Sequence, residues 1–515
     1  MKAFKRIRKF ISLHPIMSFI LLIFATIIFS GILDFFDASV NYSKINVKTG
    51  SIESTLVTIE SLFNLSGIKY IFSHTVSNFA SFAPLSTLLI LLMGISIMDV
   101  SGFLDTMFFV VTKKAPKFMV TWVFTIVCLL INLTGDISFI VFIPLGALLF
   151  KYGKRNPMIG IVHGFASCGL GYGLHLFTSS IDSALITSTT EAANLITTSY
   201  HISSLNNIWI MIPAVIIGSI VLTYITEVVT APSLAKYEVD ENEIVEDKDS
   251  LSKREIRGLI FAGIGAFIYG IIFIYNIIPG VPFGGNLLDY SQARYIDKLF
   301  GIDSFFNSGY VFVITLLFFI CGFAYAVGAR KISNNRELCE HLSHSLDGIG
   351  KVIVLLFFAS TYISLLKYTN IGELVTAALA NVINASNFSG IPLMILVFVI
   401  SGVSGILLPS LTSRWSILAP TIVPTMMTAG FTPEAAQLVF TVGSSITYIL
   451  TPAMAYYVIY IAYLEKYNKD GGIDIRRSFG YVLPYALFIM AMWIILLVLF
   501  YIVKINIGLH TGIVL

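Results

Sequence analysis

Apolar blocks long enough to cross a lipid bilayer recur along this chain of 515 residues, with short polar or basic segments between them. A helix needs about 20 apolar residues to span the hydrocarbon core, and these blocks are roughly 16 to 24 residues long. Only 12% of the residues are Asp, Glu, Lys or Arg, about half the share in soluble domains. The sequence therefore excludes a soluble protein and predicts an all-α polytopic membrane protein with roughly 9–11 spans.

Clusters of Lys and Arg between the apolar blocks predict the topology. The basic N-terminus precedes an apolar run without a clear cleavage site, so we expect an uncleaved first span and a cytoplasmic N-terminus. The multi-pass chain then ends outside the cell. The predicted divisions are a basic segment with the first span (1–34), an external segment with interfacial helices (35–83), a first repeat (84–230), an acidic cytoplasmic linker (231–256), a second repeat (257–503) and an external tail (504–515).

Two apolar blocks, about 157–190 and about 388–430, are interrupted by Gly, Ser, Thr and Pro. Irregular backbone at membrane depth is tolerated only where it faces protein or a wet cavity. A similar motif follows each block, Thr-Thr-Glu-Ala-Ala-Asn at 189–194 and Thr-Pro-Glu-Ala-Ala-Gln at 432–437, and the basic clusters give the blocks opposite orientations. The pattern predicts inverted repeats, each with a re-entrant helical hairpin, as in secondary transporters that bind substrate near the bilayer midplane.

Few ionisable residues lie within the apolar blocks, and each is a functional candidate because a charge there is costly. Asp182 lies in the first interrupted block and is a candidate for coupling transport to an ion; the alternative is a helix cap. Asp136, a second ion-coupling candidate, occupies either an external turn or a half-buried polar break. His175 at the first hairpin tip is either pH-sensitive or a hydrogen-bonded structural histidine.

The tip of the second interrupted block carries the candidate substrate contacts. Arg414 could hold a substrate carboxylate and Trp415 could stack on a planar group. The alternative is an interface pair, with the arginine snorkelling and the tryptophan in the aromatic belt. Hydroxyl groups complete the predicted substrate-binding set: Thr178, Ser179, Thr412, Ser413 and Ser444.

Two prolines indicate helix boundaries near this site. Pro433 follows Thr432, which predicts a capped helix start with proline at the first helical position. Pro452 lies inside a long apolar block and should break its helix, so that carbonyl groups face the site. Both are candidates for a hinge or helix break.

Motifs for nucleotide hydrolysis, dinucleotide binding and zinc peptidases are absent from the sequence. Transport would therefore run on an ion gradient, with H+ or Na+ as the coupling ion and no cofactor. Cys339, His341 and His344 could bind a metal together, but their segment is more typical of a cytoplasmic helix, and no metal site is predicted. The formal net charge of +3 and the scattered basic clusters indicate no nucleic-acid partner.

The order and spacing of several short motifs resemble the AbgT family, the p-aminobenzoyl-glutamate transporters of the ion transporter superfamily. The resemblance implies bowl-shaped homodimers with two hairpins per protomer. It also implies uptake of aminobenzoyl-glutamate or, in some members, efflux of sulfonamide antimetabolites. The motifs are His14-Pro15, Asn78–Leu85, Asn132–Asp136, Ile181–Ala193, Lys367–Gly372 and Arg414–Pro424.

The family's hairpin aspartate falls on Asp182, and the hydroxyl and tryptophan of its second hairpin fall on Thr412 and Trp415. Its two prolines fall on Pro433 and Pro452.

The chain departs from the family pattern at five positions. Family members typically carry Arg-Ile-Gly-Asp after the second hairpin, where this chain has Thr441-Val-Gly-Ser444. A usual Asn is replaced by Tyr448, and the hairpin-tip Asn of the first repeat is His175. The lost arginine predicts altered recognition of a dicarboxylate, and the lost asparagines favour proton coupling through Asp182 over a sodium site.

The leading hypothesis is a gradient-driven secondary transporter of a small organic solute that carries a carboxylate and a planar part. The expected location is the bacterial cytoplasmic membrane, and the expected partners are the bilayer, the solute and a second copy of the chain. An efflux pump for sulfonamide-like antimetabolites and a carrier of a different carboxylate or peptide-like solute are the alternatives within transport. A non-transporting scaffold or an intramembrane enzyme is the alternative of another class. No facing base and nucleophile support an enzyme.

Overall fold

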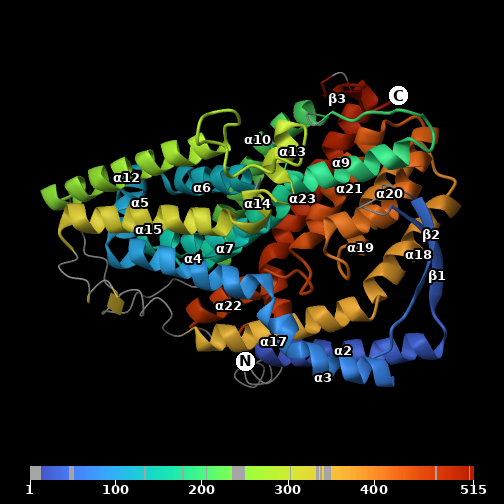
Figure 1. Cartoon of the computed structure of the whole chain (residues 1–515), viewed down its shortest axis with the longest axis horizontal. Coiled ribbons are helices and arrows are strands. Elements are labelled where there is room, and N and C mark those ends of the chain that lie inside the picture. The colour runs from blue at the N-terminus through green and yellow to red at the C-terminus, as the bar shows by residue number, and fades with distance from the viewer. Residues whose placement is uncertain are drawn as a thin grey trace.

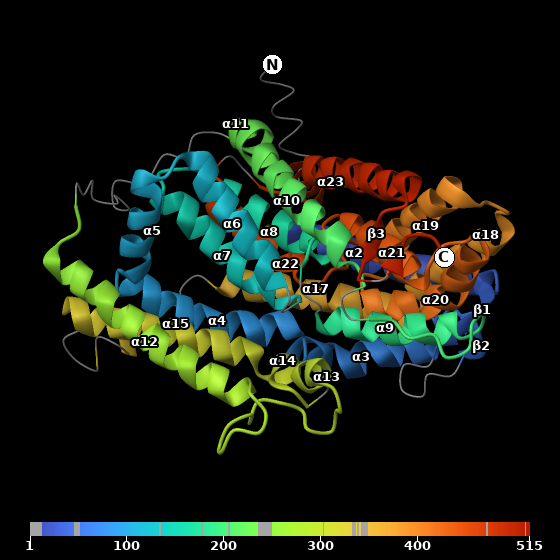
Figure 2. The same ribbon diagram turned by 90° about the horizontal axis from the view of Figure 1, so that it is seen from above.

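Helices make up most of the computed structural model, and many run side by side along the long axis of the molecule (Figure 1). Figure 2, turned by 90°, shows the same bundle from above. His341, His344, Thr178 and most of the predicted acidic linker lie outside the described residues. The structure describes residues 13–45, 52–132, 135–176, 179–203, 206–234, 250–301, 303–331, 336, 339–340, 349–469, 472–509 and 511–515.

The first half of the chain contains ten α-helices, one 3-10 turn and one π-helical turn within its described residues. These are α2 (Pro15–Phe35), α3 (Leu65–Ala80), α4 (Ala83–Val100), α5 (Phe103–Lys114), α6 (Lys117–Ile131), α7 (Ile137–Tyr152), α8 (Pro157–Leu170), η2 (Gly171–Gly173), α9 (Ser180–Ala193), α10 (Ile208–Ile225), η3 (Thr226–Thr230) and α11 (Ala231–Ser233).

The second half continues with helices that pack against the first. These are α12 (Lys253–Ile277), α13 (Tyr295–Phe300), α14 (Phe305–Ser308), α15 (Tyr310–Ala329), α17 (Gly350–Tyr368), α18 (Ile371–Ala385), α19 (Gly390–Ser404), α20 (Leu411–Thr428), α21 (Pro433–Tyr448), α22 (Tyr457–Tyr467) and α23 (Ile475–Val503).

Seven helical segments among the described residues are long and apolar enough to cross a membrane by length and composition. Shorter apolar helices, such as α6, α7, α18 and α19, add to them. α12 shows why the bundle needs lipid around it: only 11% of its most apolar window is buried inside the protein, and water would be a poor solvent for that surface. The seven segments are Pro15–Phe35, Leu65–Val100, Ile208–Ser233, Lys253–Ile277, Tyr310–Ala329, Gly350–Tyr368 and Ile475–Val503.

Both interrupted blocks contain a break between two helices, as their composition predicted. We call residues 171–182, from the end of α8 through the first turn of α9, the first break, and residues 405–414, from the end of α19 through the first turn of α20, the second break. The helices after the breaks, α9 and α20, pack alongside each other (Figure 1, Figure 2). The two breaks therefore belong to neighbouring parts of the bundle although they are far apart in sequence.

The similar motifs that follow the blocks do not occupy equivalent elements. Residues 189–193 form the last turns of α9, whereas Thr432 caps α21 and residues 433–437 form its first turns. The two motifs nevertheless touch, because the hydroxyl of Thr189 donates a hydrogen bond to Gln437 Oε1 at 2.6 Å. The motif similarity thus coincides with a contact between α9 and α21.

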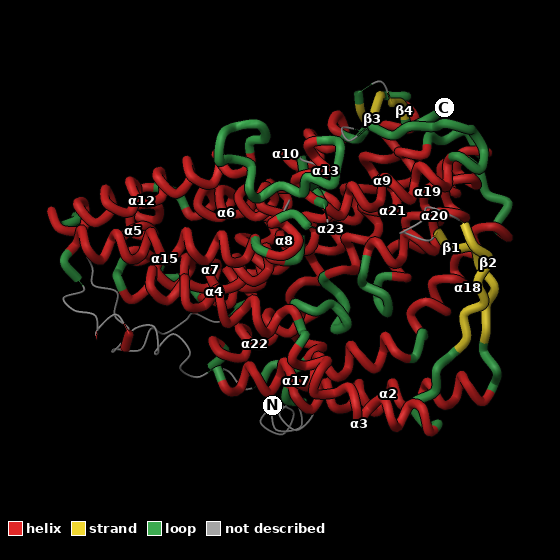
Figure 3. The backbone as a smooth tube through the Cα atoms, viewed as in Figure 1, coloured by secondary structure: helices red, strands yellow, loops and turns green. Residues whose placement is uncertain are grey.

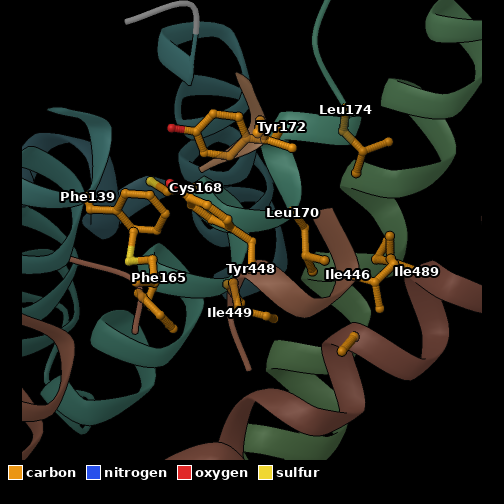
Figure 4. Close-up of a cluster of buried hydrophobic side chains, with 14 of the residues drawn as sticks. Phe139, Phe165, Cys168, Leu170, Tyr172, Leu174, Ile446, Tyr448, Ile449 and Ile489 are labelled. Atoms are coloured by element: carbon orange, nitrogen blue, oxygen red, sulfur yellow. The ribbon is translucent and has the colours of Figure 1, made fainter. Parts of the chain in front are cut away.

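A buried apolar cluster lies beneath the first break, where η2 meets α21 and α23. Figure 4 shows Phe139, Phe165, Tyr172 and Tyr448 gathered here with aliphatic side chains. Phe165 stacks on Tyr460 with ring centroids 4.1 Å apart. Aromatic packing of this kind fixes the helices that carry the neighbouring polar residues.

Small residues allow α19 and α21 to approach closely. A side chain at Gly443 would collide with the carbonyl oxygen of Phe398, and one at Gly402 would lie 3.1 Å from the Gly443 carbonyl. Close backbone contact through small residues stabilises helix pairs in lipid, where the hydrophobic effect between helices is weak. The last turns of α21 are therefore held close to the end of α19, directly before the second break.

Two small β-hairpins lie at the edge of the bundle, β1–β2 at its right-hand end and β3–β4 at the top in Figure 3. Antiparallel strands β1 (Ser39–Ile45) and β2 (Ile52–Thr58) lie within the predicted external segment and pack on α18 and α20. Strands β3 (Asn506–Gly508) and β4 (Thr511–Gly512) form the C-terminal tail. We expected only interfacial helices in the external segment, so the strands β1 and β2 differ from that expectation. Among the described residues of this segment, α3 is the one complete helix. Strand pairing satisfies the backbone hydrogen-bonding groups of the remainder without a helix.

Candidate transport site

A cavity of about 450 Å³ opens between the second break, the corner that joins α17 to α18, and the start of α7. Its size lies within the range of pockets for small organic molecules. Apolar side chains such as Ile363 and Leu366 form part of the wall, and polar groups converge on it from several elements. The polar and charged lining residues are Asp136, Lys367, Asn370, Glu373, Ser410, Thr412, Ser413 and Tyr448.

Three hydroxyl side chains form the wall that the second break contributes. Ser410 is the N-cap of α20: its Oγ accepts from the Ser413 backbone N–H at 3.3 Å and donates to Ser413 Oγ at 2.9 Å. Thr412 Oγ1 lies 3.3 Å from Ser410 Oγ. Hydroxyl residues at a helix N-terminus satisfy free backbone donors. Thr412 and Ser413, two of the predicted substrate contacts, therefore line the cavity.

Asp136 presents one carboxylate oxygen to the protein and the other to the cavity. Its Oδ1 accepts hydrogen bonds from the hydroxyls of Tyr172 and of Tyr448, the latter at 2.6 Å. Its Oδ2 accepts none from the residues that the structure describes, and the side chain is half-buried at the cavity wall. Of the two alternatives for this residue, the structure shows the half-buried polar break directly before α7.

Asp182 takes part in the cap of α9, which is the structural alternative to its predicted coupling role. Ser179 Oγ accepts from the Asp182 backbone N–H at 3.2 Å, and Asp182 Oδ2 accepts from the Ser179 backbone N–H at 2.8 Å, which completes a capping box. The same Oδ2 lies 3.0 Å from His175 Nε2. The first break thus holds a carboxylate and an imidazole in contact, and the coupling role of Asp182 stays a prediction.

Arg414 is 0% exposed and lies behind the cavity wall. Its Nη1 donates to the carbonyl of Ser401 at 2.6 Å, and its Nη2 donates to the carbonyl of Pro409 at 3.4 Å. No carboxylate among the described residues lies within 4 Å of the guanidinium. Ser401 is in the last turn of α19, where the helix dipole is negative and favours a cation. In this conformation Arg414 fastens the second break to α19, and its predicted contact with substrate stays a prediction.

Trp415 is also 0% exposed and joins the two halves of the bundle. Its Nε1 donates to Thr189 Oγ1 at 2.9 Å, and its ring lies 4.4 Å from that of Phe440 between centroids. An indole with both faces packed and its N–H satisfied is a structural anchor. Contact with a solute would therefore require the second break to move.

The remaining predicted residues lie on α21 and in the segment that follows it. Ser444 Oγ donates to the Ser401 carbonyl at 3.3 Å, the same oxygen that Arg414 contacts. The helix start at Pro433 with Thr432 as N-cap is confirmed. α21 ends at Tyr448, and Pro452 lies in the irregular segment that follows, where Thr451 Oγ1 donates to the Ile406 carbonyl at 2.5 Å. This hydrogen bond connects the segment after α21 to the second break.

Residues 10–515 match the sequence model of the AbgT transporter family. This chain is an AbgT-family transporter. It is 25% identical over 495 residues to the p-aminobenzoyl-glutamate transport protein of Escherichia coli, which covers 96% of this chain and 93% of that protein.

Two solved structures resemble this AbgT-family chain. MtrF of Neisseria gonorrhoeae, described as illuminating a class of antimetabolite efflux pumps, is 28% identical with a TM-score of 0.50, over 98% of this chain and 97% of that one. The YdaH transporter of Alcanivorax borkumensis, whose topology is described as unusual, is 25% identical with a TM-score of 0.48, over 96% and 100%. The resemblance found in the sequence motifs is therefore confirmed by the family match.

Sequence reasoning on this AbgT-family chain missed three polar residues of the cavity: Lys367, Asn370 and Glu373. They lie in or next to a motif that was used only for the family resemblance. A lysine at the end of an apolar run, followed three residues later by an asparagine, was an available signal for a polar corner. In the structure Lys367 lies in the last turn of α17, and Asn370 adopts a φ of 57° at that corner. Tyr172 and Tyr448 as donors to Asp136 gave no local signal, because they come from distant elements.

Proposed function

We propose that this AbgT-family transporter carries a small organic acid across the bacterial cytoplasmic membrane and is driven by an ion gradient. The cavity at the second break supports the proposal most directly: hydroxyl groups line one wall, and Asp136 exposes an oxygen at another. Broken helices that supply polar groups to an enclosed site are the means by which secondary transporters hold solutes. Thr412 and Ser413 are the proposed solute contacts.

Ion coupling is proposed at Asp182 and Asp136. Asp182 contacts His175 at 3.0 Å, and an imidazole changes its charge near neutral pH. Asp136 receives two tyrosine hydroxyls on one oxygen and leaves the other for a proton or a cation. Because both residues carry titratable groups, we propose H+ as the coupling ion, with Na+ as the alternative that the transport assay distinguishes.

The test is solute uptake by reconstituted protein in liposomes under imposed pH or Na+ gradients. The probes are p-aminobenzoyl-glutamate, p-aminobenzoate and a sulfonamide. We expect saturable accumulation of at least one acid that depends on the pH gradient. The absence of flux with every probe, together with no thermal stabilisation by any of them, would contradict the proposal and favour a non-transporting scaffold.

A cavity-filling variant links transport to this site. Thr412→Trp should block flux because the added ring occupies the space beside Ser413. Thr428→Trp is the matched control, since Thr428 lies on the same helix, is exposed and is outside the cavity lining. Equal flux in the two variants would mean that the solute passes elsewhere.

Export of antimetabolites is the second candidate function, and the likeness to MtrF favours it. Export would use the same cavity with the opposite net direction. Liposomes with the protein sorted by orientation distinguish the two: faster gradient-driven movement from the cytoplasmic face supports export, and faster movement from the external face supports uptake.

The family resemblance further supports a homodimer, and the basic residues before the first span support a cytoplasmic N-terminus. Mass measurement of the detergent-solubilised protein tests the dimer, and labelling of a single cysteine placed before the first span of a cysteine-free variant tests the orientation.

A further inference from the structure

The cavity has three charged side chains among its lining residues, and two of them already have partners. Asp136 Oδ1 accepts hydrogen bonds from two tyrosine hydroxyls. Glu373 pairs with Lys44 of β1 at 3.8 Å. Lys367 is the third, and its side chain makes no hydrogen bond or ion pair within the part of the chain that the structure describes.

Lys367 is also placed differently from the other cation near the second break. The guanidinium of Arg414 is buried, and its Nη atoms donate to carbonyl groups of the protein. Lys367 lies in the last turn of α17, is exposed and lines the cavity. Lys367 therefore gives the cavity lining a cation that an anionic solute can reach, whereas Arg414 is not part of the lining.

We propose that Lys367 anchors the carboxylate of the transported solute, with the hydroxyls of Thr412 and Ser413 as further donors from the second break. This assignment rests on the proposed function and specifies the recognition within it. An ammonium group provides a strong charge-assisted hydrogen bond to a carboxylate. The helix-terminal position of Lys367 by itself explains stabilisation of α17, but it does not explain why the side chain lines the cavity.

The free oxygen of Asp136 specifies the rest of the solute. It is a hydrogen-bond acceptor that faces the same cavity without a donor from the described residues. A solute with a carboxylate at one end and an amine or amide N–H at the other matches Lys367 and Asp136 together. The cavity thus selects amino-carboxylates over neutral analogues and over acids that lack a donor.

Lys367→Gln tests the anchor, with p-aminobenzoate and its neutral analogue p-aminobenzamide as probes. We expect the wild-type protein to bind the acid more tightly than the amide, and Lys367→Gln to weaken binding of the acid at least tenfold while binding of the amide is unchanged. Lys367→Arg keeps the charge and should retain most of the affinity. The measurements are ligand-dependent thermal stabilisation and competition for flux in liposomes.

Lys351→Gln is the matched control, because Lys351 lies on the same helix, is exposed and is outside the cavity lining. Its affinity for the acid should equal that of the wild-type protein. A Lys367→Gln protein that binds the acid as tightly as the wild type overturns the Lys367 assignment alone. A wild-type protein that binds p-aminobenzoate no more tightly than p-aminobenzamide also overturns the assignment, even if another probe is transported. Failure of the wild-type protein with every probe overturns the proposed function, and the assignment falls with it.

Discussion

The two helix breaks carry different chemistry although they share a helix-capping design. The first break brings the imidazole of His175 within 3.0 Å of the Asp182 carboxylate. The second break presents the hydroxyls of Thr412 and Ser413 to the cavity and covers the guanidinium of Arg414. Imidazole titrates near neutral pH, whereas a guanidinium keeps its charge. The first break is therefore suited to coupling an ion, and the second to holding a solute.

The caps show how the difference arises. Ser179 caps α9 with Asp182 three residues later, and Ser410 caps α20 with Ser413 three residues later. Each N-cap hydroxyl accepts from the backbone N–H at the third position. At that third position the first break has an aspartate and the second break has a serine. This one difference gives the first break an ionisable carboxylate that the second break does not have at this position.

The largest expected effect comes from adding a carboxylate beside Arg414. Ser444→Asp should stabilise the protein or leave it unchanged, because Ser444 and Arg414 contact the same carbonyl and the new pair would be neutral. Ser445→Asp should destabilise it by about 3–5 kcal/mol, because Ser445 is buried beside Gly173 and its hydroxyl contacts only a backbone carbonyl among the described residues. Thermal unfolding in detergent measures both. Equal destabilisation by the two variants would mean that Arg414 does not compensate a charge at 444.

The second expected effect separates the breaks by pH. Asp182→Asn keeps a residue that can cap a helix but removes the ionisable group, so pH-gradient-driven flux should fall at least tenfold. Ser413→Ala at the equivalent cap position should change solute affinity and leave the pH dependence in place. Flux measured between about pH 5 and pH 8 is the test. A Ser413→Ala protein that loses its pH dependence would place coupling at the second break as well.

A smaller effect is expected from the tyrosines that join Asp136 to the two halves of the chain. Tyr448→Phe removes one hydrogen bond to Oδ1, which is worth about 1.5–3 kcal/mol when the acceptor is charged. The apparent affinity for the coupling ion should change roughly tenfold or more by the same arithmetic. Tyr456→Phe is the control, since Tyr456 is buried nearby and donates no described hydrogen bond to Asp136. An unchanged ion dependence in Tyr448→Phe would remove Asp136 from the coupling proposal.

The smallest effect concerns the contact between the helices that follow the breaks. Thr189→Val removes the acceptor of the Trp415 N–H and the donor to Gln437. The variant should lose about 1–3 kcal/mol of stability, because buried polar atoms are left unpaired. Trp415→Phe combined with Thr189→Val should cost less than the sum of the single variants. Additive losses in thermal unfolding would show that the hydrogen bond does not couple α9 to α20.

Local patterns predicted the elements of the site better than its surface. The break before α9 and the capped start of α21 followed from Ser, Thr, Asp and Pro at short spacings, and the structure contains both. The same reasoning grouped Arg414, Trp415 and Ser444 with Thr412 and Ser413 as solute contacts. Only the last two line the cavity, because helix periodicity over one turn does not reveal which neighbours cover each face.

The sequence by itself determined the class of the protein, since hydropathy, charge placement and helix caps act over a few residues and are readable in order. It also indicated the family, through the order and spacing of several short motifs. Tertiary structure alone decided which charges reach the cavity. Tyr448 meets Asp136 across 312 positions of the chain, and Arg414 is buried by carbonyl groups of another helix, while Lys367 is left facing the cavity. Those contacts arise from packing between distant segments, which no local pattern specifies.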